Sequence, residues 1–200
     1  MQFADIIGQK ETKQQLAELV QHNRLSHALL FLGKEGSGSL SLAIAFAQYV
    51  VCEKVNGGKS GVGSQESGPS LFGEPENSNV EPPTLNDSCG VCPACQKAQQ
   101  LIHPDIHFSY PTVTKKPGEK PVATDFITDW REFVKLSPYG NSYDWIEQIK
   151  EKENSQGKIT AEECNDIIRK LSLKSFESEY KILIMWMPEM LGTEGNKLLK

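Results

Sequence analysis

The segment from Gly33 to Leu40 has the glycine spacing of a phosphate-binding loop. Such a loop uses glycines so that backbone N–H groups can surround a phosphate, a Lys ammonium that reaches the phosphates, and a Ser or Thr hydroxyl that binds Mg²⁺. Gly33, Gly36 and Gly38 are present. Ser39, however, stands where the Lys belongs, and Leu40 stands where the hydroxyl belongs. We therefore expect a degenerate Walker A loop that holds no tightly bound ATP and does not hydrolyse it.

Four of the five cysteines have the spacing of metal ligands. Cys89, Cys92 and Cys95 stand three residues apart, and Cys52 precedes the long stretch that separates it from them. Four thiolates match a tetrahedral Zn²⁺ site with no open coordination position, so the metal would be structural. His103 is an alternative to Cys52 as the fourth ligand. Ordinary reduced thiols are the other interpretation, but three cysteines within seven residues favour zinc.

Other titratable side chains lack a catalytic pattern. His103 and His107 have no carboxylate pair or nucleophile nearby, so we expect structural roles for them. Cys164 falls within a helical pattern and is most simply a small buried side chain. Glu189 follows Pro188 and stands off the end of an expected strand, which disfavours a role in activating water. We therefore assign no catalytic residue.

Hydrophobic periodicity predicts the elements that would position the glycine loop. A helix is expected over 12–22, with Ile6 and Ile7 joining its apolar side. Residues 26–32 form a continuous apolar run, which is typical of a strand buried on both faces of a parallel sheet. Residues 40–51 are apolar nearly all round and predict a helix packed into the core. The order strand, glycine loop, helix is the context that a phosphate loop requires.

The middle of the chain predicts one strand and three helices. The strand is expected over 106–110, and two short helices over 125–136 and 143–149. Thr160 and Glu163 resemble a capping box that begins the third helix. The larger side chains of the two short helices are expected to pack in the core and not to stack on bases. They are Phe126, Trp130, Phe133, Trp145 and Ile149.

The run 180–186 predicts a second buried strand of the parallel type. In a hydrolysing phosphate-loop protein, the end of such a strand carries an Asp that binds Mg²⁺ and an acid that activates water. This strand instead ends in Trp186 and Met187. Because the cationic and the acidic parts of the ATPase machinery are missing together, we expect a fold that is retained without catalysis.

Composition excludes several classes of protein. The chain has 200 residues, 38% of them hydrophobic, and a net charge of −5. No stretch is long and apolar enough to span a membrane, and the N-terminus lacks the pattern of a secretory signal, so we expect a cytoplasmic protein. The acidic balance argues against a surface that coats nucleic acid, because DNA affinity depends mainly on Lys and Arg.

Residues 1–200 are expected to form one α/β domain with two insertions. Gly, Pro, Ser, Asn and Glu dominate residues 53–88, which we expect to be a disordered loop. This loop would lie inside a zinc-binding insertion over 52–95. Residues 117–158 would form an additional helical insertion.

Several short motifs occur in the order seen in bacterial clamp-loader subunits of DNA polymerase III, which are AAA+ proteins. The chain resembles these subunits over nearly its whole length, apart from residues 53–88 and the additional helical segment around 117–158. The Ser39-Leu40 and Trp186-Met187 pairs depart from the hydrolysing gamma and tau subunits, and this favours the delta-prime type. The matching motifs are residues 5–9, 27–31 and 33–39, the four cysteines, His103-Pro104-Asp105, and residues 196–200.

The resemblance implies a P-loop NTPase-like (AAA+) fold with three layers, a parallel sheet and an inserted zinc module. It implies a subunit without intrinsic ATPase activity inside a DNA-directed DNA polymerase complex. Its partners would be the gamma/tau and delta subunits and, through the complex, the sliding clamp and primer-template DNA. In the family, a Ser-Arg-Cys motif lies further along the chain than Lys200. We therefore expect 1–200 to be the incomplete N-terminal AAA+ domain of a longer protein.

Two alternatives stay open. A gamma/tau-like ATPase would need a substitute cation such as Lys34, which lies at the start of the loop and would have to reach back over it. A zinc-ribbon module that binds nucleic acid would need basic residues near the cysteines. Lys97 is the only Lys or Arg between residues 88 and 103.

Overall fold

The computed structural model describes residues 1–56, 86–115, 118–151, 155–193, 195 and 198. Within these ranges, no helix combines the length and the apolar composition that crossing a membrane requires. The elements in chain order, with η for a 3-10 helix, are η1 (Phe3–Asp5), α1 (Lys10–Gln21), α2 (Ser39–Val51), α3 (Glu53–Asn56), α4 (Pro93–Gln99), β1 (Ile106–Ser109), η2 (Ala123–Phe126), α5 (Ile127–Leu136), α6 (Ser142–Ile149), α7 (Ala161–Ser172), β2 (Ile182–Met185) and η3 (Pro188–Met190).

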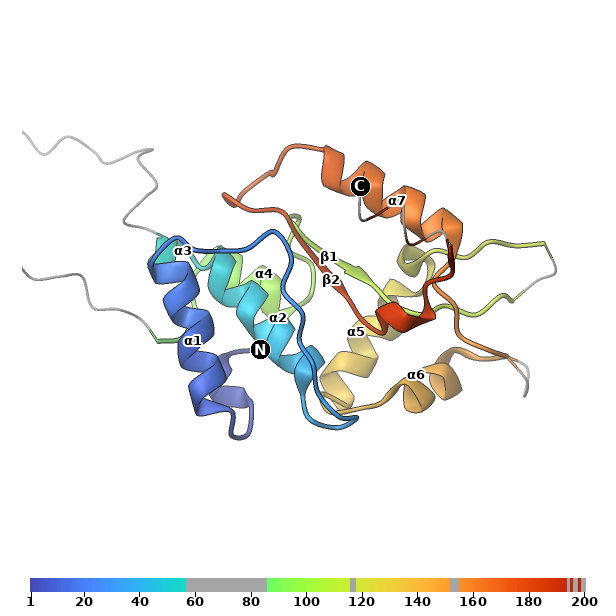
Figure 1. Cartoon of the computed structure of the whole chain (residues 1–200), viewed down its shortest axis with the longest axis horizontal. Coiled ribbons are helices and arrows are strands. Elements are labelled where there is room, and N and C mark those ends of the chain that lie inside the picture. The colour runs from blue at the N-terminus through green and yellow to red at the C-terminus, as the bar shows by residue number, and fades with distance from the viewer. Residues whose placement is uncertain (57–85, 116–117, 152–154, 194, 196–197, 199–200) are drawn as a thin grey trace, which may run out of the picture.

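Two parallel strands form the centre of the fold (Figure 1). β1 and β2 pair in register, from Ile106 opposite Ile182 to Ser109 opposite Met185. Helices α1, α2 and α4 lie on one side of this pair and α7 lies on the other, while α5 and α6 lie beyond the carboxyl ends of the strands. The mixed helix and strand architecture and the parallel pairing agree with the α/β class that the sequence predicts. The described residues contain no third strand in this sheet.

The predicted strand over 26–32 is wrong. This segment has no regular secondary structure, and the side chains of Leu30 and Leu32 are 74% and 84% exposed. An apolar run becomes a buried parallel strand only where neighbouring strands pair with its backbone and helices cover its faces. In the described part of the chain the sheet contains β1 and β2 alone, so this segment has no strand to pair with. Ile7, predicted on a buried side, is likewise 81% exposed.

Helix α2 is the central helix of the protein, as its apolar sequence predicts. Its residues contribute to both hydrophobic clusters. Ile44 and Val51 pack in the cluster that includes the strands, α4 and α5. Leu42 and Phe46 pack in the cluster that includes η1 and α1. The segment that contains Gly33, Gly36 and Gly38, here called the glycine-rich loop, leads directly into α2. Packing of α2 in both clusters therefore fixes the position of this loop.

An aromatic cluster holds α5 against the end of the sheet. Trp130 stacks on Tyr110 with ring centroids 4.0 Å apart, and it meets Trp145 edge-on at 5.3 Å. Trp186, which directly follows β2, lies 5.4 Å from Trp130 and 5.7 Å from Phe133. All five side chains are buried. Their contacts confirm the packing roles predicted for the aromatic residues of α5 and α6.

Helix α7 begins where the sequence predicts, but the Glu163 carboxylate does not complete a capping box. The Thr160 hydroxyl accepts a hydrogen bond from the Glu163 amide at 3.1 Å. The buried Glu163 carboxylate accepts a hydrogen bond from the Ala123 amide at 2.7 Å and so joins α7 to η2. A tertiary partner has replaced the local one. Cys164 is buried, which confirms its prediction.

The predicted disordered loop over 53–88 is wrong at both ends. Glu53–Asn56 forms α3, and Asp87 and Ser88 make hydrogen bonds to the N-terminal segment and to α2. Residues 57–85 lie outside the described residues, so the prediction stands untested there. Within the predicted helical insertion, α5 and α6 confirm two short helices.

Candidate metal centre and glycine-rich loop

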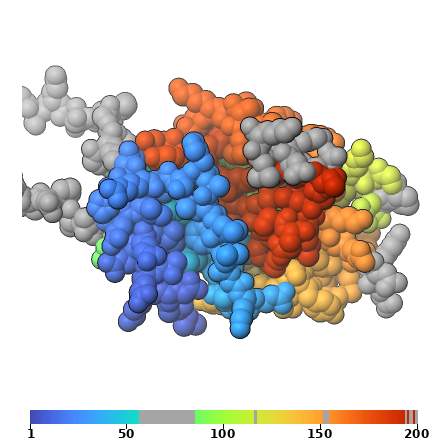
Figure 2. All heavy atoms as spheres, viewed as in Figure 1, coloured from blue at the N-terminus to red at the C-terminus, as the bar shows by residue number. Residues whose placement is uncertain are grey.

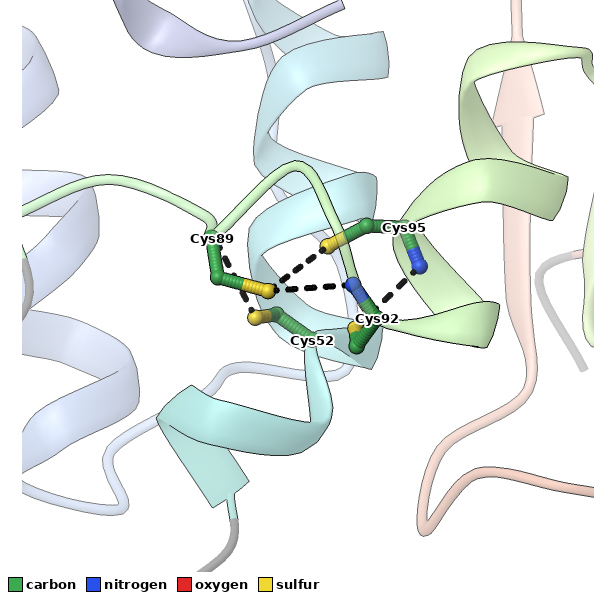
Figure 3. A group of neighbouring side chains, drawn as sticks. All are labelled: Cys52, Cys89, Cys92 and Cys95. Atoms are coloured by element: carbon green, nitrogen blue, oxygen red, sulfur yellow. Dashed lines mark hydrogen bonds between the residues drawn. The ribbon is translucent and has the colours of Figure 1, made fainter.

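Four cysteine sulfurs converge between the end of α2 and the start of α4 (Figure 3). The Sγ atoms of Cys52, Cys89, Cys92 and Cys95 all lie within 4.8 Å of one another, and those of Cys89 and Cys95 are 3.9 Å apart. Sulfurs bound tetrahedrally to Zn²⁺ at about 2.3 Å would lie roughly 3.8 Å from one another. The four side chains could therefore bind a metal ion, and the structure brings together all four cysteines that the sequence singled out.

Local backbone geometry explains this convergence. Cys52 is the C-cap of α2, and Cys92 is the N-cap of α4, where Pro93 takes the first helical position. The Cys92 amide donates a hydrogen bond to Cys89 Sγ, and the Cys95 amide donates one to Cys92 Sγ, each at 3.4 Å. The Cys89 amide donates to Cys52 Sγ at the same distance. Such N–H groups stabilise thiolates, which are the metal-binding form of cysteine.

Contacts within the cysteine cluster shift the pKa values of its thiols in opposite directions. A hydrogen bond from Cys95 lowers the pKa of Cys52, and the same contact, together with burial, raises the pKa of Cys95. Burial also raises the pKa of Cys92. The hydrogen bond from Cys95 thus favours the thiolate form of Cys52. A divalent cation would replace the thiol protons and allow the other thiols to ionise as well.

Asp87 joins the cysteine cluster to the N-terminal segment. Its carboxylate accepts hydrogen bonds from the amides of Phe3 and Ala4 at 3.0 and 2.9 Å. The adjacent Ser88 hydroxyl accepts one from Gln48 Nε2 at 2.9 Å in the buried interior. The backbone that leads into Cys89 is therefore fixed from two sides. Sequence reasoning missed Asp87, because its partners are more than eighty residues away and no local pattern marks it.

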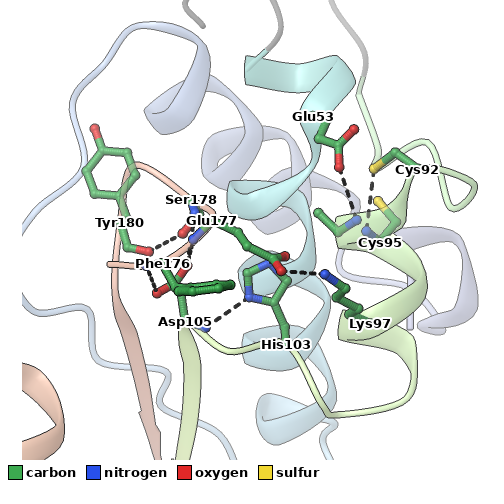
Figure 4. Close-up of polar contacts among 11 residues, drawn as sticks. Glu53, Cys92, Cys95, Lys97, His103, Asp105, Phe176, Glu177, Ser178 and Tyr180 are labelled. Atoms are coloured by element: carbon green, nitrogen blue, oxygen red, sulfur yellow. Dashed lines mark hydrogen bonds and ion pairs between the residues drawn. The ribbon is translucent and has the colours of Figure 1, made fainter. Parts of the chain in front are cut away.

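His103, the alternative fourth ligand, lies in a separate polar cluster (Figure 4). Its Nδ1 accepts a hydrogen bond from the Asp105 amide at 3.1 Å, and its Nε2 lies 3.9 Å from the Glu177 carboxylate. The buried Asp105 carboxylate accepts three hydrogen bonds, at 2.6 to 2.9 Å, from the consecutive amides of Phe176, Glu177 and Ser178. This His-Pro-Asp motif therefore ties the loop before β2 to the start of β1, a structural role.

An Asp105→Asn variant is expected to be less stable than the natural chain at neutral pH. Burial alone would raise the pKa of Asp105, but the hydrogen bonds from Glu177 and its neighbours outweigh burial and lower it. A lowered pKa stabilises the fold above the unfolded-state value of about 3.9, and this stabilisation is lost as pH falls through the folded-state value. We expect a loss of about 2 kcal/mol at neutral pH that shrinks in acid.

Urea unfolding at a series of pH values measures this difference. Glu35→Gln, at an exposed position of the glycine-rich loop, is the matched control and should have little effect at any pH. A destabilisation by Asp105→Asn that stayed constant from neutral to strongly acidic pH would contradict the role of the ionised carboxylate.

The glycine-rich loop has the backbone shape that its glycines permit. Gly36 and Gly38 have φ angles of 75° and 79°, in the region where glycine is favoured. Ser39 begins α2, so the predicted junction of loop and helix is confirmed. Gly33 and Gly36 are exposed, whereas Gly38 is buried. Lys34, the proposed substitute cation, is exposed.

Apolar residues occupy the positions where a hydrolysing phosphate-loop protein binds Mg²⁺ and activates water, and they lie in or against the hydrophobic core. Leu40 and Met187 pack against the same cluster that contains the buried Trp186. Trp186 is 8% exposed and contacts the aromatic rings of α5. Glu189 is exposed within η3, after Pro188. The end of β2 is therefore a packing surface in this chain.

These features define an α/β protein whose glycine-rich loop leads into a central helix, with four convergent cysteines at the far end of that helix. A family profile described as "DNA polymerase III, delta subunit" matches residues 8–70 and 58–200. The chain belongs to this DNA polymerase III clamp-loader family. The mixed helix and strand fold with its small parallel sheet is consistent with a clamp-loader AAA+ domain.

One curated relative is DNA polymerase III subunit tau/gamma of Haemophilus influenzae, which is 44% identical over 50 residues. These residues make up 25% of this chain and 7% of the relative, so the match spans a small part of both proteins. No solved structure matches the chain. The comparisons confirm the resemblance at the level of the clamp-loader family.

Proposed function

We propose that this chain is a non-hydrolysing clamp-loader subunit of the delta-prime type, which helps to load the sliding clamp onto primed DNA through subunit contacts. One observation carries the proposal: Leu40, Trp186 and Met187 pack in or against one hydrophobic cluster. By resemblance, hydrolysing members carry a hydroxyl and two acids at these positions. Apolar side chains at these positions stabilise the fold by packing with this cluster, and they cannot bind Mg²⁺ or activate water.

The metal that the four cysteines would hold is, in this proposal, a structural Zn²⁺. Thiolates are soft ligands that favour Zn²⁺ over Mg²⁺ or Ca²⁺, and four of them leave no coordination position for a substrate. Cys52, Cys92 and Cys95 are buried, and Cys89 is partly buried. When bound, the ion would supply a cross-link between α2 and α4, and the cysteines would position it.

The proposed partners follow from the family. A subunit without its own ATP chemistry contributes through contacts with the gamma/tau and delta subunits. Through that complex it would act on the sliding clamp and primer-template DNA. The net charge of −5 supports a role based on protein contacts, because binding to DNA alone requires a basic surface.

The natural chain is expected to show no ATP turnover in the presence of Mg²⁺, and a Ser39→Lys/Leu40→Thr variant is expected to show none either. The variant regains a cation and a hydroxyl, but the end of β2 still lacks an acid. Phosphate release measures turnover, with a hydrolysing clamp-loader subunit as the positive control. Turnover by the natural chain would overturn the proposed function. Turnover by the variant alone would show that the strand end does not limit hydrolysis.

A gamma/tau-like subunit is the second candidate, favoured by the similarity to the tau/gamma relative. Tight, Mg²⁺-dependent ATP binding by the natural chain would support it. A zinc-ribbon module that binds nucleic acid is the third candidate. Lys97, the one Lys or Arg between residues 88 and 103, forms an ion pair with Glu177, which leaves it less available for a phosphate. Salt-dependent DNA binding by this chain would support that candidate.

A further inference from the structure

The turn between α5 and α6, residues 137–140, lies directly on the glycine-rich loop. A Cβ placed on Gly38 would be 2.6 Å from Cε1 of the Tyr139 ring, so the ring packs against the backbone of this glycine. The Ser41 hydroxyl, in the first turn of α2, donates a hydrogen bond to the Pro138 carbonyl. Gly38 is buried by these neighbours, although Gly36 is exposed. The turn therefore covers the part of the loop nearest the helix.

The N-terminal segment holds this arrangement from the other side. The Ile7 amide donates a hydrogen bond to the Tyr139 hydroxyl at 2.9 Å. Gln9 Nε2 donates one to the Ser37 carbonyl at 2.7 Å. The loop is thus fixed between two segments that are far apart in sequence. Figure 2 shows the loop segment, in mid-blue, reaching the yellow region of α5 and α6 on this face of the protein.

The turn is itself fixed by the aromatic cluster. A Cβ on Gly140 would lie 2.7 Å from the Phe133 ring, so the turn packs tightly on α5. Phe133 in turn contacts Trp186 at the end of β2, with centroids 5.7 Å apart. The helical insertion therefore packs at both places where a phosphate-loop protein carries its chemistry, the loop and the strand end.

We propose that Tyr139 and the turn that carries it close the glycine-rich loop to nucleotide phosphates. A phosphate binds such a loop through the N–H groups of the glycines and of the first helical turn, which must be accessible. Here Tyr139 packs on this region independently of the missing Lys and hydroxyl. The inference rests on the proposed function, and it adds that restoring the lost side chains is insufficient to restore nucleotide binding.

The test compares Mg²⁺-ATP affinity, by isothermal titration calorimetry, among variants of the full chain. The Ser39→Lys/Leu40→Thr variant should bind ATP at least about tenfold more weakly than the same variant with Tyr139→Ala added, a difference of ~1.4 kcal/mol. Tyr143→Ala is the matched control, because its side chain is 69% exposed on α6, and it should not strengthen binding. Equal affinity with and without Tyr139 would overturn the inference.

Hydrogen exchange in the otherwise natural sequence provides a second measurement that does not depend on nucleotide. Tyr139→Ala should speed exchange of the amides of Ile7 and residues 36–40, whereas Tyr143→Ala should not. Tyr139→Phe keeps the ring against Gly38 and should expose only the Ile7 amide. Unchanged exchange in Tyr139→Ala would also overturn the inference. ATP hydrolysis by the natural chain would overturn the proposed function, whereas equal affinity or unchanged exchange in a chain that does not hydrolyse ATP would overturn the inference alone.

Discussion

A Cys92→Ala variant is expected to lose the zinc that we expect the natural chain to bind at about one ion per molecule. Cys92 contributes a sulfur to the four-cysteine cluster and caps α4, where its Sγ accepts a hydrogen bond from the Cys95 amide. Three remaining thiols would leave one tetrahedral position to water and weaken the site by a large factor. Elemental analysis after extensive dialysis measures the metal content of both proteins.

Cys164→Ala is the matched control, because Cys164 is buried in α7, outside the four-cysteine cluster. This control should keep its zinc. Loss of zinc in Cys92→Ala should also speed hydrogen exchange in α4 and at the amides of Phe3 and Ala4, which donate hydrogen bonds to Asp87. The amides of β1 and β2 should stay protected. Equal zinc content in Cys92→Ala and the natural chain would remove Cys92 from the ligand set.

The cysteine cluster could be predicted because its information is largely local. Cys89, Cys92 and Cys95 follow one another at a ligand spacing, and Cys52 ends a helix that hydrophobicity alone identifies. The same holds for α2 and for the two paired strands. Each is a short segment whose apolar side chains indicate burial, and its predicted bounds lie within a few residues of those observed.

The failures have a common physical cause in contacts between distant residues. The run 26–32 has the composition of a buried strand, but pairing depends on neighbours that the run does not encode. Nothing in the local sequence marks Tyr139, whose hydroxyl accepts a hydrogen bond from the Ile7 amide, 132 positions earlier. Glu163 has a suitable local capping partner, yet its carboxylate binds Ala123 instead. Hydrophobic periodicity indicates which side chains are suited to burial, but it does not identify the distant residues that they must contact.

A Trp186→Asp variant, which introduces an acid at the end of β2, is expected to lower the free energy of unfolding by at least about 3–5 kcal/mol. The variant loses a buried indole that contacts Trp130 and Phe133, and it places a carboxylate in an apolar cluster. An unpaired charge in such surroundings adds a further cost. Urea unfolding followed by far-ultraviolet circular dichroism measures the change.

Two comparisons show whether this position is a packing site or a metal site. Tyr143→Ala removes an exposed aromatic ring from the neighbouring α6 and should change stability by no more than about 0.5 kcal/mol. Mg²⁺ with ATP should not restore the stability of Trp186→Asp, because Leu40 offers no hydroxyl to complete a metal site. The packing of Trp186 indicates that the end of β2 no longer binds a metal ion. A Trp186→Asp variant that was as stable as the natural chain, or that Mg²⁺ with ATP stabilised, would contradict this conclusion.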